Sequence, residues 1–102
     1  MIEASFSIRK DSASFTIKGH SGSDVSGRDI VCAAVSSAAY MAANTVTEIL
    51  GVKDAEAEVD DGYMHFNVSG SNAAGDIIRG LQLHLTQLAE EYPDFVIVTT
   101  EV

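Results

Sequence analysis

Hydrophobic and polar residues alternate in two short segments at the start of the chain. Apolar side chains occupy every second position over residues 2–8 and again over residues 13–17, with a polar link at residues 10–12 between them. A period of two places the apolar side chains on one face of a β-strand. Two such strands around a short polar link predict an antiparallel hairpin.

A second pair of alternating segments covers residues 55–60 and 63–68. Asp61 and Gly62 lie between them, and Asp-Gly strongly favours a two-residue hairpin turn. One face of the later segment is apolar and consists of Met64, Phe66 and Val68. The pattern predicts a second hairpin, with this face turned toward the core.

Two longer segments have the spacing of helices. The first runs from Asp29 to about Leu50 and is followed by a glycine, a common helix stop. Its apolar residues cover well over half of the circumference, so we expect this helix to be covered on more than one side. The second helix starts after Ser71 or Asn72, either of which can cap it, and ends at the single proline.

The last apolar segment, Phe95–Val98, is hydrophobic on both faces, which predicts a central rather than an edge strand. The element order is therefore β-β-α-β-β-α-β. This order predicts an α+β fold, with a mostly antiparallel sheet packed with two helices. At 102 residues the chain forms a single domain over residues 1–102.

Composition and charge exclude several classes of protein. With 6 Lys+Arg against 15 Asp+Glu the net charge is −9, which argues against nucleic-acid binding and favours a basic partner. The longest nearly apolar stretch, Ile30–Ala43, is too short to span a bilayer, and the amino terminus lacks the pattern of a signal peptide. One cysteine allows no internal disulfide and is too few for a cysteine-based zinc site. We expect a cytoplasmic protein without metal or cofactor.

Chemistry is concentrated around residues 19–28, which contain three glycines and three serines and predict a mobile surface loop. His20 lies at the start of this loop, whereas His65 and His84 have the positions of a surface and a structural histidine. Cys32 follows within the first turn of the helix that starts at Asp29, where the helix dipole favours a thiolate.

His20 and Cys32 are separated by 11 residues, nearly all small or polar, so the two side chains can meet at hydrogen-bonding distance. A thiol activated by an imidazole is the usual arrangement for nucleophilic acyl transfer. In this hypothesis His20 takes the thiol proton and returns it to the leaving amine.

Supporting roles are assigned to three further features. Asp24 or Asp29 is a candidate to orient the imidazole, although capping the helix is the primary role expected of Asp29. Ser36 lies four residues after Cys32 on the same helical face and is a candidate to line the site. The backbone N–H groups of Ile30–Ala33 are candidates to stabilise an oxyanion, if they belong to the first turn.

The loop and the helix start carry a specific motif, which reads Gly19-His20 followed by Gly27-Arg28-Asp29-Ile30-Val31-Cys32-Ala33-Ala34-Val35-Ser36. It resembles the signature of the ribosomal-processing cysteine protease family (Prp), G-H-(A) followed by G-x-D-I-V-C-A-x-x-S. The length and the order of elements also agree with that family over the whole chain.

The resemblance implies a cysteine endopeptidase in which Cys32 and His20 form the catalytic dyad. It further implies cleavage of the N-terminal extension of ribosomal large-subunit protein twenty-seven after an aromatic residue, a step of ribosome maturation, and a homodimer. The segment with Gly19, Ser21, Gly22 and Gly27 corresponds to the family's substrate loop, although Ser21 stands where the family usually has alanine.

Two other hypotheses remain open from the sequence. In the first, the chain is a non-catalytic acidic module that binds a basic ribosomal protein or an assembly factor, and Cys32 only packs. This hypothesis predicts salt-sensitive binding that survives Cys32→Ala. In the second, His20 and Cys32 hold a metal with one acidic residue, but two ligands across a loop are too few to favour it.

Overall fold

The computed structural model describes residues 1–19 and 26–101, of which residues 26–29 are described by their backbone. In chain order the elements are β1 (Ile2–Ile8), β2 (Ser12–Lys18), α1 (Ser26–Asn44), a π-helical turn (Thr45–Ile49), β3 (Ala55–Asp60), β4 (Tyr63–Ser69), α2 (Asn72–Glu91) and β5 (Val96–Glu101). The predicted order β-β-α-β-β-α-β and both predicted hairpins are confirmed.

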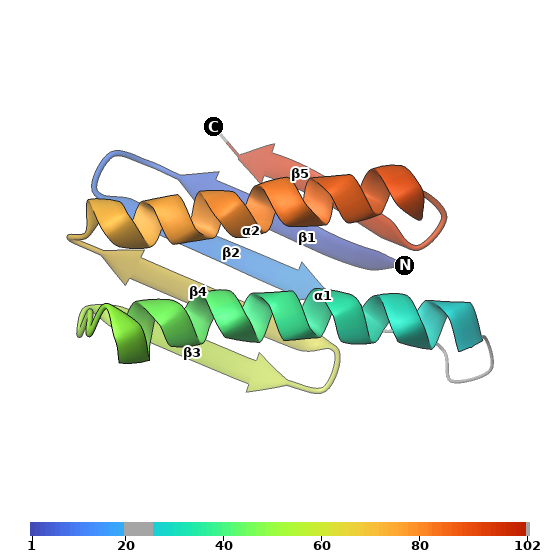
Figure 1. The fold of residues 1–102 in the computed structure, drawn as a ribbon, viewed down its shortest axis with the longest axis horizontal. Helices are drawn as coiled ribbons and strands as arrows, with labels where there is room; N and C mark the ends of the chain where they lie inside the picture. Colours follow the sequence, from blue (N-terminus) through green and yellow to red (C-terminus); the bar gives the residue numbers. More distant parts are fainter. Residues whose placement is uncertain (20–25, 102) are drawn as a thin grey trace.

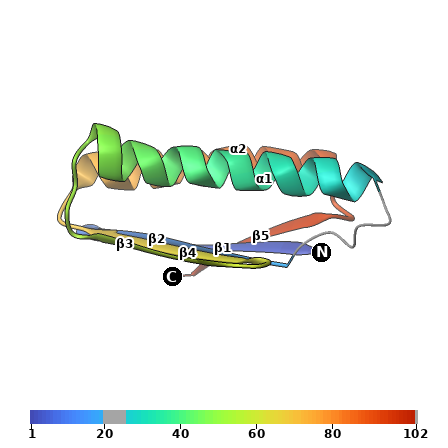
Figure 2. The same cartoon turned by 90° about the horizontal axis from the view of Figure 1, so that it is seen from below.

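The five strands form one mixed sheet in the order β3-β4-β2-β1-β5. All neighbouring pairs are antiparallel except β1 and β5, which are parallel. Both helices lie on the same face of the sheet, α1 above β3 and β4 and α2 above β1 and β2 (Figures 1 and 2). The molecule therefore has two layers, with the core between the helices and one face of the sheet.

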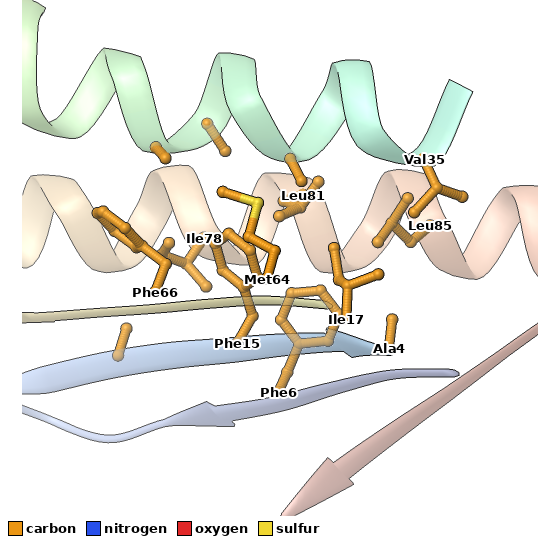
Figure 3. Close-up of a cluster of buried hydrophobic side chains, with 14 of the residues drawn as sticks. Ala4, Phe6, Phe15, Ile17, Val35, Met64, Phe66, Ile78, Leu81 and Leu85 are labelled. Carbon is orange, nitrogen blue, oxygen red and sulfur yellow. The ribbon is translucent and has the colours of Figure 1, made fainter. Parts of the chain in front are cut away.

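A row of three phenylalanines crosses the middle of the sheet and forms the centre of the core. Phe15 on β2 pairs with Phe6 on β1 and with Phe66 on β4. The ring centroids are 6.0 Å apart for the first pair and 5.6 Å for the second, and all three side chains are at most 1% exposed. They point toward the helix layer (Figure 3). Burying each ring stabilises the fold by about 2–3 kcal/mol.

The second helix is positioned by its cap and by its apolar stripe. The Ser71 side chain accepts a hydrogen bond of 3.1 Å from the Ala74 N–H, which confirms one of the two predicted caps. Four side chains of α2 are buried against the sheet, namely Ala74, Ile78, Leu81 and Leu85. Their spacing of three or four residues fixes which side of the helix faces the core.

The expectation that the apolar tail is a central strand is wrong, because β5 is an edge strand. Val96 is buried toward the helices, but Ile97 points to the other face and is 44% exposed. No helix covers that face among the described residues, so a strand can be apolar on both sides without being buried on both sides.

The first helix differs from expectation at its start and in its burial. It begins at Ser26 rather than Asp29, and its outward side is open, with Ile30 68% and Met41 73% exposed. The segment Ile30–Ile49 is long and apolar enough to cross a membrane by length and composition alone. In the fold it lies along the sheet instead, and its inner side is buried through Val31, Val35, Ala39, Ala42, Ala43 and Val46.

Candidate active site

Cys32 lies on the wall of a surface cleft. It is the seventh residue of α1 and is half-buried, in contact with the hydrophobic core on one side. Its other surroundings are the cleft between α1 and the turn that joins β3 to β4. A half-buried thiol in a cleft is held in place by packing and still has space on one side for a reacting group.

Two elements distant in sequence form the walls of this cleft. The α1 wall consists of Cys32, Ser36, Ala39 and Tyr40. The opposite wall is the β3–β4 turn with its flanking residues, Val59, Asp60, Asp61, Gly62, Tyr63 and Met64. Ile17 and Gly19 from the end of β2 complete the lining. In Figure 1 the β3–β4 turn lies alongside α1.

Gly19 fixes the end of β2 at the edge of the cleft. Its N–H donates a hydrogen bond of 2.9 Å to the carbonyl oxygen of Gly62 in the β3–β4 turn. Its φ angle is +93°, and a Cβ at this position would collide with the carbonyl oxygen of Met1. Only glycine satisfies both conditions. The backbone thus ties the residue before His20 to the wall opposite Cys32.

The sequence-predicted site residues fall into three groups. Cys32, Ser36 and Gly19 are brought together in one cleft. Gly27 and Asp29 belong to the first turn of α1 by their backbone. The remaining ones, His20, Ser21, Gly22 and Asp24, lie outside the described residues. Most of the segment predicted to be a mobile loop, residues 19–28, lies outside them too.

The helix start at Ser26 corrects three expectations. Asp29 is the fourth residue of α1 and therefore does not cap it. Cys32 lies in the second turn, beyond the first turn where the helix dipole stabilises a thiolate most strongly. The N–H groups of Ile30–Ala33 lie past the first four residues, so intrahelical carbonyls accept from them and they are not free for an oxyanion. Residues 26–28, which the pattern predicts as part of a loop, belong to the helix by their backbone.

The other two histidines do not line this cleft. Nδ1 of His65 lies 2.7 Å from the hydroxyl of Thr16 on the helix-free face of the sheet, where the imidazole is half-buried. His84 is exposed and lines the groove between α1 and α2. Among the side chains that the structure describes, in residues 1–19 and 30–101, no group of three from His, Cys, Asp or Glu is arranged to hold a metal ion.

Sequence reasoning missed the wall opposite Cys32. The sequence pattern predicts a hairpin that includes Val59, Asp60 and Asp61 and a helix that includes Tyr40, and it assigns none of them to the site. Tyr40 lies eight residues after Cys32, so helical spacing was a usable signal for it. No local signal connects residues 59–64 to Cys32, because their proximity results from the packing of α1 over β3 and β4.

Comparisons of the sequence and of the fold with known proteins give matches to one family. The family model described as Cysteine protease Prp matches residues 1–97. A Bacillus subtilis (strain 168) protein named ribosomal processing cysteine protease Prp is 29% identical over 111 residues, covering 100% of this chain and 99% of its own.

Solved structures agree with these matches. A crystal structure of a Streptococcus mutans protein has 31% identity and a TM-score of 0.82, over 98% of this chain and 93% of that one. The ribosomal processing protease Prp from S. aureus, crystallised with a substrate peptide, has the same fold. Its TM-score is 0.78 and its identity 21%, over 99% of this chain and 100% of that one.

Proposed function

The chain belongs to the cysteine protease Prp family, and we propose that Cys32 and His20 are the dyad with which it removes the N-terminal extension of ribosomal large-subunit protein twenty-seven. One observation carries the assignment of the site. Cys32 lines a cleft that Gly19, the residue before His20, also lines. Ser36, one helical turn after the cysteine, lines the same cleft, as proposed for it from the sequence. The names of the B. subtilis and S. aureus relatives support the ribosomal substrate.

The proposed reaction has two steps. His20 accepts the proton of the Cys32 thiol, and the sulfur attacks the carbonyl carbon of the scissile peptide bond. The C–N bond then breaks as the imidazolium returns the proton to the leaving amine, leaving a thioester on Cys32. Water deprotonated by His20 attacks the thioester and releases the new carboxyl end together with the thiol.

The charge of the chain supports a basic substrate. The net charge is −9, and Asp60 and Asp61 are exposed at the lip of the cleft that contains Cys32. Ribosomal proteins carry basic tails that bind RNA, and an acidic cleft attracts them over a distance of about one Debye length, roughly 8 Å at physiological salt. Raising the salt concentration should therefore raise KM more than it changes kcat.

We also propose that the protein acts in the cytoplasm as a homodimer. Exposed apolar side chains on the outward sides of the helices, including Ile30, Met41 and Leu83, support an interface between copies. Sedimentation equilibrium of the purified chain would give twice the monomer mass, and cell fractionation would recover the protein with soluble contents. A monomer at all concentrations would contradict the first proposal, and recovery with membranes the second.

Cleavage of a peptide that copies the start of the cell's own ribosomal protein twenty-seven tests the assignment. We expect Cys32→Ala and His20→Ala each to lower kcat/KM by about a thousand-fold or more, by mass spectrometry of the products. His84→Ala is the matched control, since this exposed histidine lies outside the cleft. Circular dichroism of each variant establishes that the fold is intact.

The acidic binding module predicts a different result. In that case no peptide is cleaved, and salt-sensitive binding to the basic protein is equal for the wild-type chain and Cys32→Ala. Undiminished cleavage by either dyad variant would also contradict the proposed mechanism.

A further inference from the structure

Two apolar side chains are exposed in the cleft at a distance from the nucleophile. Tyr40 on α1 is 45% exposed and Val59 on β3 is 51% exposed, and both line the cleft that contains Cys32. Other exposed apolar side chains lie elsewhere: Met41 lines the groove between the helices, and Leu83 lines a shallow depression on α2. Tyr40 and Val59 come from opposite walls and therefore face a shared space.

Helical geometry gives the separation of Cys32 and Tyr40 along the axis of α1. Cys32, Ser36 and Tyr40 follow one another at intervals of four residues along the α1 wall. Eight residues of helix span about 12 Å at a rise of roughly 1.5 Å each. An extended peptide advances about 3.3–3.6 Å per residue. A substrate strand along this wall therefore passes Tyr40 about three or four residues from the bond attacked by Cys32.

We propose that Tyr40 and Val59 form a second specificity subsite, which binds an apolar substrate side chain about three or four residues from the cleaved bond. This inference rests on the proposed function, because it assigns the cleft to a peptide substrate. This subsite would select among substrates independently of the residue next to the scissile bond. Tyr40 and Val59 are positioned to determine specificity and take no part in the chemistry.

The surrounding residues favour an aliphatic or aromatic occupant. Ala39, Met64 and Ile17 provide further apolar lining and are buried in the core, so the subsite has a rigid apolar base. An apolar substrate side chain would cover the exposed parts of Tyr40 and Val59 and remove apolar area from water. A hydrophobic pocket discriminates between side chains that differ by one methylene group by about 10–200-fold.

The experiment uses a set of short peptides with one aromatic residue before the scissile bond. A single leucine is placed at each other position in turn, on both sides of the bond, in an otherwise alanine background. Binding is measured by fluorescence anisotropy with the Cys32→Ala chain, so that the result does not depend on turnover. Cleavage by the chain with Cys32 present is measured with the same peptides.

We expect leucine to improve affinity about ten-fold at one position, about three or four residues from the bond. Adding Tyr40→Ala or Val59→Ala should reduce this preference to less than about two-fold at that position alone, whereas Tyr40→Phe should keep it. Ile97→Ala, on the helix-free face of β5, is the control for removing an exposed apolar side chain outside the cleft.

Failure of this inference and failure of the proposed function give different results. A preference for leucine that Tyr40→Ala and Val59→Ala leave unchanged, or no preference at any position, overturns the subsite even if the peptides are cleaved. Position-specific binding without cleavage overturns the proposed protease substrate and supports the subsite. Absence of both binding and cleavage overturns both.

Discussion

Replacing Gly19 by alanine tests whether the backbone at the cleft edge is fixed as the structure indicates. A φ angle of +93° costs a non-glycine residue about 1–3 kcal/mol. The added Cβ also collides with the carbonyl oxygen of Met1, and relieving an overpacked contact costs about 1–3 kcal/mol more. We therefore expect Gly19→Ala to lower the free energy of unfolding by about 4 kcal/mol, the middle of the combined range of about 2–6 kcal/mol.

Two other glycines provide controls that separate the collision from the strain. Gly51 and Gly70 have φ angles of +66° and +75°, but a Cβ at either position would meet nothing within 4 Å. Their alanine variants should lose only about 1–2 kcal/mol. Since about 1 kcal/mol shifts the Tm of a domain of this size by roughly 4–8 °C, Gly19→Ala should melt about 10 °C or more below them.

Thermal and urea unfolding followed by circular dichroism would measure these differences. A loss in Gly19→Ala within about 1 kcal/mol of the Gly51→Ala loss would refute the reasoning, because the contact with Met1 would then carry no cost. Peptide cleavage well below the Tm gives a second readout. We expect kcat/KM to fall further than the folded fraction does, because Gly19 directly precedes His20.

Three other substitutions test the fold. Phe66→Ala should cost about 3–5 kcal/mol by urea unfolding, because the ring is fully buried beside Phe15; a loss below about 1 kcal/mol would contradict the packing. Ser71→Ala should cost about 1 kcal/mol through loss of the α2 cap, and Ser71→Asp should restore most of it; equal stability of both variants would argue against the cap. Gly80→Ala should stabilise the chain by about 1 kcal/mol, since it lies inside α2 with open space around its Cβ position; a lower Tm would show that this space is not available.

Local pattern was sufficient for most secondary structure. Alternation over residues 2–8 and 13–17 predicted β1 and β2, because a strand with one covered face must alternate. Asp61-Gly62 predicted the tight turn, and its glycine has a φ angle of +68°. Ser71 predicted the start of α2, because its hydroxyl accepts from a nearby backbone N–H.

Pattern failed where burial depends on distant elements. The apolar tail predicts a central strand, but the place of β5 is decided by which strand edge remains free after β1, β2 and β4 have paired. The pattern predicts that α1 starts at Asp29, because residues 19–28 are polar and rich in glycine. The backbone from Ser26 is nevertheless helical, so composition alone did not locate the boundary.

The candidate site also combines residues that the local sequence predicts with residues that only the packing of distant elements brings in. The sequence by itself determined Cys32 as the proposed nucleophile, Ser36 on its side of the helix, and the motif that places the chain in its family, because these depend on spacing within one short segment. Only the tertiary structure decided that Val59 and Asp60 belong to the same cleft as the sulfur. The physical reason is that this wall forms when α1 packs across β3 and β4, and a contact between residues so far apart along the chain leaves no periodicity in either segment.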